Sequence, residues 1–160
     1  MSEDSQKLTK SEQMRTMLED TVFAKGSWEG RGTDGLLQWF VQFTNNTLLE
    51  VSVTLTVGGN LISGSLISST AYFEQLASDF STPFNNIEGV EPEQIKTMIL
   101  AMAPEPDPEG TYDFPYQFIH LRNAKVYSGT GGAIVSPGSL WRGRITAIDG
   151  FSLGSITQSE

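Results

Sequence analysis

Residues 49–68, with the sequence LEVSVTLTVGGNLISGSLIS, carry the clearest structural pattern in the chain. From Leu49 to Val57 apolar residues alternate with polar ones, which is the period of a strand with one buried face. Gly58-Gly59-Asn60 tolerates the positive φ angles of a tight hairpin turn. Residues 61–68 supply the return strand, and Gly64 predicts a bend or bulge within it. We therefore expect an antiparallel β-hairpin over residues 49–68.

The segment before this hairpin, residues 36–43, is short and dense in apolar groups. Its sequence, LLQWFVQF, favours a short helix, although a strand of the same length is an alternative. In the helical form the inward residues are Leu36, Leu37, Phe40 and Val41.

Two further helices are expected after the hairpin. One starts at Ser69 or Thr70, either of which can cap it, and ends near Phe80. The other covers residues 92–103 and begins at Pro92, a residue suited to the first helical position. Residues 104–110, PEPDPEG, exclude a helix or a strand and predict an extended acidic loop.

The last third of the chain returns to strands. Residues 118–127 form one strand, with a bulge expected near Asn123, and residues 140–148 form another. Asp149-Gly150 predicts a hairpin turn that pairs residues 140–148 with a final strand over residues 151–156.

These elements predict a mainly β, α+β fold. Short, strongly bent strands, several with a central glycine, favour a small antiparallel barrel or sheet of the SH3-like or Sm-like kind with added helices. An open α+β sheet packed by the helices is the alternative. Neither form indicates a function by itself.

Charge is distributed unevenly in this acidic chain, which has a formal net charge of −9. Residues 74–113 contain nine acids and one base, whereas residues 116–156 contain four bases and one acid. Nucleic acids and anionic membranes are therefore not expected as partners. The separation suits either a solvated acidic loop or a dipolar molecule that self-associates.

Catalytic groups are scarce. The chain has no cysteine and one histidine, His120, for which a structural or surface role is favoured over a pH-sensitive contact. Arg142 and Arg144 lie on one strand face, where they can bind a carboxylate or a phosphate. We expect no cofactor, no metal ion and no enzymatic activity; an enzyme with an acid–base pair such as Asp149 with Glu50 is the catalytic alternative.

Several motifs resemble the GvpU family of gas-vesicle accessory proteins. They are FIHLRNAKVY at 118–127, WRGRI at 141–145, DGFSLGSI at 149–156, GGN at 58–60, ISG at 62–64 and STAYF at 69–73. Together they cover roughly residues 48–80 and 116–157. Residues 1–35 and 81–115 lie outside the resemblance, and Ser128 occupies a position where one member of the family has a cysteine, so no thiol role is carried over.

The resemblance implies a non-catalytic cytoplasmic protein that binds gas vesicles, their shell protein or other gas-vesicle proteins and influences clustering or assembly, with self-association. We divide the chain into an N-terminal tail over residues 1–30, either an amphipathic helix or a frayed segment, and one globular GvpU-like domain over residues 34–157. That domain carries an acidic, Pro-rich insertion at about 81–115. The alternative function is an Sm-like module that binds single-stranded RNA. The candidate binding residues are His120, Arg122, Lys125, Trp141, Arg142 and Arg144.

Overall fold

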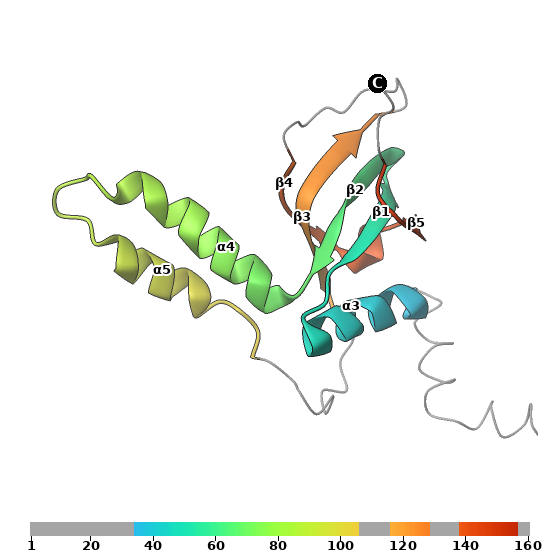
Figure 1. Cartoon of the computed structure of the whole chain (residues 1–160), viewed down its shortest axis with the longest axis horizontal. Coiled ribbons are helices and arrows are strands. Elements are labelled where there is room, and N and C mark those ends of the chain that lie inside the picture. The colour runs from blue at the N-terminus through green and yellow to red at the C-terminus, as the bar shows by residue number, and fades with distance from the viewer. Residues whose placement is uncertain (1–33, 106–115, 129–137, 157–160) are drawn as a thin grey trace, which may run out of the picture. The chain divides into compact units, whose positions relative to one another are not determined.

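The computed structural model describes residues 34–105, 116–128 and 138–156, and their strands form one antiparallel sheet (Figure 1). In spatial order it contains β4 (Ser139–Arg144), β3 (Phe118–Tyr127), β2 (Asn60–Ile67), β1 (Val51–Val57) and β5 (Gly150–Leu153). The helices are α3 (Gly35–Thr47), α4 (Ser69–Ser81) and α5 (Pro92–Leu100), with 3₁₀ turns η1 (Thr82–Phe84) and η2 (Ile145–Ala147). The expected mainly β, α+β fold is confirmed in its open form: within the described residues, β4 and β5 are edges that do not pair with each other, so no barrel closes.

The expected C-terminal hairpin is wrong. β4 pairs with β3, whereas β5 lies at the opposite edge and pairs with β1. The chain leaves β4 through η2, whose first residue, Ile145, is buried in the core. Asp149 then joins the β1–β2 turn instead of forming a hairpin turn of its own. Its backbone N–H donates to the Thr56 carbonyl at 2.8 Å, and its carboxylate accepts from the Gly58 N–H at 2.9 Å.

The bends expected at Gly64 and near Asn123 are confirmed, and they lie opposite each other. The register between β2 and β3 shifts between Ser63 and Ser65, and Asn123 has a φ of 53°. A Cβ at Gly64 would lie 2.9 Å from the Arg122 carbonyl oxygen, so only glycine lets β3 approach here. Because β3 has one extra residue at the bulge, Leu121 before it and Ala124 after it lie on the same face of the sheet.

One face of the sheet, called the α3 face below, packs against α3. Leu37 and Val41 are buried as expected, but the prediction for Leu36 is wrong, because its side chain is 57% exposed. Gln38 is buried instead, because its side-chain amide forms hydrogen bonds with the backbone of the segment that leads into β3. Its Nε2 donates to the Tyr116 carbonyl at 2.7 Å, and its Oε1 accepts from the Tyr116 N–H at 2.8 Å. The core on this face consists of Leu37, Val41, Val53, Leu55, Ile62, Leu66, Ile119, Leu121, Ala124 and Ile145.

The other face, called the α4 face, is partly covered by the start of α4. The N-cap of α4 is Ser68, not Ser69 or Thr70, and its Oγ accepts from the Ala71 N–H at 3.1 Å. Helices α4 and α5 lie side by side (Figure 1). A second apolar cluster joins them to the sheet; its buried members are Ile67, Tyr72, Phe73, Ala77 and Ile99.

The helix expected over 92–103 is shorter in the structure and forms α5. Part of the acidic insertion predicted at about 81–115 is therefore regular structure, while residues 106–115 lie outside the described residues. The predicted N-terminal tail, residues 1–30, also lies outside the described residues. Among the helices that the structure describes, none is long and apolar enough to cross a membrane.

Candidate functional site

Four of the six candidate binding residues meet on the α4 face of β3 and β4. Arg142 is the cross-strand partner of His120, and Arg144 is the partner of Phe118. Arg122 and Lys125 lie on the same face of β3, on either side of the bulge. We call this group, Arg122, Lys125, Arg142 and Arg144, the basic strip.

Trp141 does not belong to the basic strip. Its cross-strand partner is Leu121, so its side chain lies on the α3 face and packs against the core. The indole ring lies over the backbone of Gly143, where an added Cβ would come within 2.0 Å of the ring. Gly143 is therefore needed to make room for Trp141.

His120 lies beneath the basic strip and is only 3% exposed. Its ring centre lies 4.4 Å from that of Tyr72 and 6.2 Å from that of Phe73, both at the start of α4. Burial, together with the positive charge of Arg142, lowers the pKa of His120 from 6.5 to about 4. The imidazole is therefore neutral at pH 7, and its Nε2 has no hydrogen-bond partner within the described residues.

Arg142 is held over two aromatic rings. Its guanidinium carbon lies 3.9 Å from the centre of the Phe118 ring and 5.6 Å from that of Phe73. Such cation–π contacts restrict the side chain while leaving its N–H groups facing solvent. Arg142 thus presents a fixed, exposed positive charge.

The other three bases of the strip differ in whether they pair with an acidic side chain. Arg122 donates from Nη1 to a carboxylate oxygen of Glu50 at 2.6 Å, in a half-exposed ion pair. Within the described residues, neither Lys125 nor Arg144 forms an ion pair. The net positive charge of the strip therefore comes from Lys125, Arg142 and Arg144.

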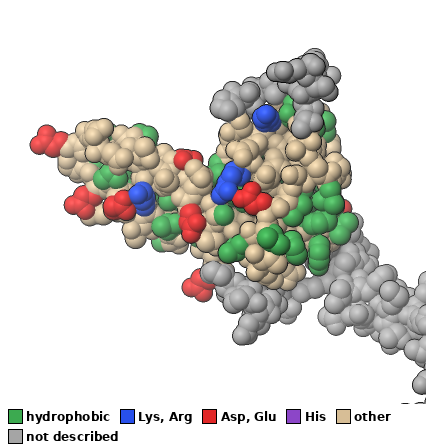
Figure 2. Space-filling model, in the orientation of Figure 1, with side chains coloured by type: hydrophobic (Ala, Val, Ile, Leu, Met, Phe, Trp, Pro, Cys, Tyr) green, Lys and Arg blue, Asp and Glu red, His purple; other side chains and the backbone are tan. Residues whose placement is uncertain are grey.

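Acidic side chains gather on different elements. In Figure 2 they are spread over the part of the surface formed by α4, α5 and the segment between them. They are Glu74, Asp79, Glu88, Glu91 and Glu93. The one base there, Lys96, donates to Glu93 at 2.6 Å. The charge separation seen along the sequence is therefore also a separation in space.

The predicted acid–base alternative, Glu50 with Asp149, is wrong. Glu50 precedes the first residue of β1, whereas Asp149 binds Gly58 just past its last residue. A strand of this length spans about 20 Å, so the two carboxylates do not act on one substrate atom. No group of three or more potential metal ligands is present in residues 34–105, 116–128 and 138–156. Most of the acidic loop expected at residues 104–110 lies outside these ranges.

Comparison with known families identifies the chain. A family model described as "Gas vesicle protein GvpU-like" matches residues 34–156. The chain belongs to the GvpU-like family. The match is continuous, so it includes residues 81–115, which the sequence motifs left out. No curated protein and no solved structure matched the chain. Membership makes this a gas-vesicle-related protein and confirms the family predicted from the motifs.

Sequence reasoning missed a row of aromatic rings on the GvpU-like domain. Trp39 stacks on Phe43 with ring centres 5.5 Å apart and meets Phe40 edge-on at 5.3 Å. Phe40 in turn meets Phe151 of β5 at 5.9 Å. Trp39 is more than half exposed. Helical spacing could have placed Trp39 and Phe43 on one side of α3, but only the strand order places β5 beside them.

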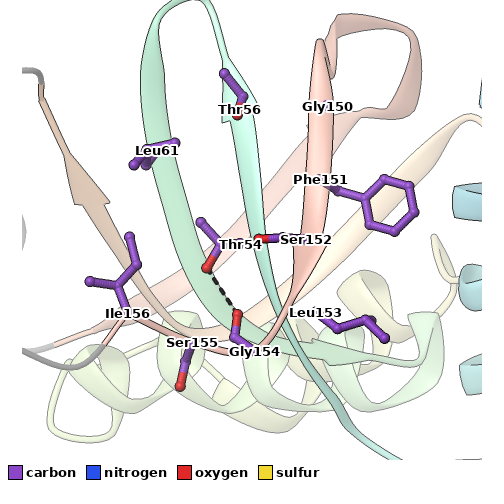
Figure 3. A pocket seen from close by; sticks show the side chains of 10 residues that line it. All are labelled: Thr54, Thr56, Leu61, Gly150, Phe151, Ser152, Leu153, Gly154, Ser155 and Ile156. Atoms are coloured by element: carbon purple, nitrogen blue, oxygen red, sulfur yellow. Dashed lines mark hydrogen bonds between the residues drawn. The ribbon is translucent and has the colours of Figure 1, made fainter.

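Sequence reasoning also missed a shallow hollow on the α4 face of β1 and β5 (Figure 3). The chain turns at Gly154 and crosses this face. Thr54 Oγ1 donates to the Gly154 carbonyl at 2.9 Å, and Ser63 Oγ accepts from the Ile156 N–H at 2.8 Å. These hydroxyls hold residues 154–156 of the GvpU-like chain, and among the described residues no ionisable side chain lines the hollow. The described lining therefore contains no acid, base or metal ligand.

Proposed function

We propose that this GvpU-like protein binds the gas-vesicle shell protein, or another gas-vesicle protein on the vesicle, through the basic strip and influences the clustering or assembly of vesicles in the cytoplasm. Family membership over residues 34–156 is the observation that carries this proposal. The protein acts by non-covalent contact and not by catalysis.

The basic strip supports the proposal because it is both charged and rigid. Arg142 is stacked on Phe118, so little side-chain entropy is lost when it binds. Arg142 and Arg144 project from alternate positions of one strand and can each engage a carboxylate of a partner protein. We therefore infer an acidic protein surface as the target.

Weak contacts suffice for this function. A vesicle shell built from many copies of one protein presents the same surface repeatedly. A bound molecule that reaches a second copy gains avidity without any new kind of contact. Electrostatic contacts of this type weaken as salt is added, because exposed charges are screened.

Flotation with purified gas vesicles tests the proposal. The wild-type protein is expected to float with the vesicles at low salt and to be released as salt rises. The double variant Arg142→Glu, Arg144→Glu is expected to lose about tenfold or more in vesicle affinity, since attraction becomes repulsion. Lys96→Glu is the control, because it reverses a half-exposed base on α5, away from the strip. Wild-type protein that stays in solution would refute vesicle binding, and an unaffected double variant would refute the role of the strip.

Single-stranded RNA binding is disfavoured by the same geometry. Such proteins stack bases on exposed aromatic faces. Here Arg142 covers the ring of Phe118, and His120 is buried under α4. A gel shift that disappears steeply with salt would instead favour the RNA function.

A further inference from the structure

We propose that the outer edge of β5 pairs with β5 of a second copy of this chain, joining two sheets across a two-fold axis at Ser152. The pairing gives the proposed function a means of linking vesicles, and only that role depends on vesicle binding. The self-association itself is tested without vesicles.

The two edges of the sheet are built differently. Proteins protect edge strands from pairing with other chains by placing charges or prolines on them. β4 carries Arg142 and Arg144, whereas β5, with the sequence GFSL, has no charge and no proline. In the described part of the chain no strand pairs with the outer edge of β5 (Figure 1).

The backbone of β5 presents its free groups at two positions. Ser152 is opposite Thr54, and the Gly154 N–H donates to the Ser52 carbonyl at 2.7 Å. The even-numbered residues therefore direct their backbone groups toward β1. Backbone direction alternates along a strand, so the N–H and C=O groups of Phe151 and Leu153 point away from the sheet.

Antiparallel pairing centred on Ser152 uses these groups. It places Phe151 opposite Leu153 of the second copy and Leu153 opposite Phe151 of the second copy, as two hydrogen-bonded pairs. All four of these side chains then lie on one face. The register is thus self-complementary in both hydrogen bonding and apolar contact, as a two-fold interface requires.

Exposed apolar area surrounds the same edge. Leu153 is 60% exposed, and the aromatic row of Trp39, Phe40, Phe43 and Phe151 adjoins it. Figure 2 shows hydrophobic side chains gathered where α3 and β5 lie in Figure 1. A two-fold axis perpendicular to the sheet puts both α3 helices on one side of the joined sheet, so the exposed apolar residues of both copies share that side.

Charge favours a second copy at this edge over other parts of the surface. Two copies of a chain with a net charge of −9 repel each other, most strongly where the acids of α4 and α5 would meet. The β5 edge is uncharged and lies on a different part of the molecule. A four-residue strand makes a small interface, so we expect weak, reversible pairing.

A single engineered cysteine tests the register. The natural chain has no cysteine, so Ser152→Cys introduces the only thiol. At the axis its Cα lies about 4.5 Å from its counterpart, within the range that a disulfide bridges. Mild oxidation is expected to convert most of the protein into a disulfide-linked dimer. Ser139→Cys, an exposed position on the β4 edge, is the control and is expected to stay mostly monomeric. Equal cross-linking of both variants, or of neither, would overturn the proposal.

A second variant tests the apolar contact. Wild-type protein is expected to sediment faster as its concentration rises, and Leu153→Asp is expected to abolish this rise, because two carboxylates would then face an apolar edge. Met98→Asp, at a 66% exposed position on α5, is expected to keep it. A wild-type protein that is monomeric at every concentration would overturn self-pairing. A strand of another protein would then be the expected partner of the β5 edge. If Leu153→Asp no longer sediments faster at higher concentration but its monomers still float with vesicles, self-pairing and vesicle binding are separate properties.

Discussion

The carboxylate of Asp149 accepts a hydrogen bond from the backbone N–H of Gly58 at 2.9 Å, which ties the start of β5 to the β1–β2 turn. The two residues are 91 positions apart in the chain. Gly58 has a φ of +55°, and its turn was predicted correctly, but Asp149 was expected to form a separate turn. The bond therefore explains how β5 reaches β1 instead of folding back on β4.

Asp149→Ala should destabilise the fold by about 1–2 kcal/mol, because it removes a charge-assisted hydrogen bond that closes a long loop. Asp149→Asn keeps an acceptor oxygen and should cost less. Denaturant unfolding of both variants measures the difference. Equal stability of wild type and Asp149→Ala would show that the bond does not hold β5 in place.

His120 should make the protein less stable as the pH falls. Its pKa is about 4 in the folded state and about 6.5 in the unfolded state, so between these values the unfolded chain binds more protons. Stability from this group is full above pH 6.5 and is lost as the pH falls toward 4, by about 3 kcal/mol at most. His120→Phe should remove this part of the pH dependence. Unfolding curves between pH 4.5 and 7, chosen to span roughly this window, provide the comparison; identical slopes in both proteins would contradict a buried neutral imidazole.

Gly143→Ala should destabilise the fold by about 2–3 kcal/mol. The new Cβ would meet the Trp141 ring at 2.0 Å and force the indole away from the core against which it packs. Gly150→Ala is the matched control, since nothing lies within 4 Å of a Cβ there. Thermal unfolding, together with near-UV circular dichroism of the tryptophans, reports both effects. A Gly143→Ala protein as stable as the control would mean that Trp141 has room to move.

Gln38→Met should cost about 2 kcal/mol. The two side chains have similar volume, but methionine loses both hydrogen bonds to the Tyr116 backbone, one donated and one accepted. Gln38→Glu keeps the acceptor but places a buried carboxylate oxygen against the Tyr116 carbonyl, which adds desolvation and repulsion, so at pH 7 it should cost at least as much as Gln38→Met. Chemical unfolding of both variants at pH 7 checks this reasoning, and a Gln38→Met protein as stable as wild type contradicts it.

Local patterns predicted most of the elements. Alternation along residues 49–57 and the glycines at 58 and 59 are confirmed as β1 and its turn, and the apolar spacing of residues 36–43 is confirmed as part of α3. Leu36 was placed inward wrongly, because a helix with apolar residues on several sides does not show which side meets the sheet.

The candidate site was predicted in part. Alternation in β4 placed Arg142 and Arg144 on one face, and pairing with β3 added Arg122 and Lys125. The same alternation put Trp141 on the opposite face. The burial of His120 under Tyr72 could not be predicted from the sequence, because α4 and β3 are far apart along the chain and meet only in the folded protein.

By itself the sequence determined the family through its motifs, and it determined the approximate positions of most strands, the β1–β2 turn and the separation of acidic from basic segments. It could do so because side-chain periodicity and turn chemistry act over a few neighbouring residues. Only the tertiary structure decided that β5 joins β1, that the sheet stays open, and which edge is left without charge. Those outcomes depend on hydrogen bonds such as that between Asp149 and Gly58, whose partners are distant in the chain and are selected by the packing of the whole core.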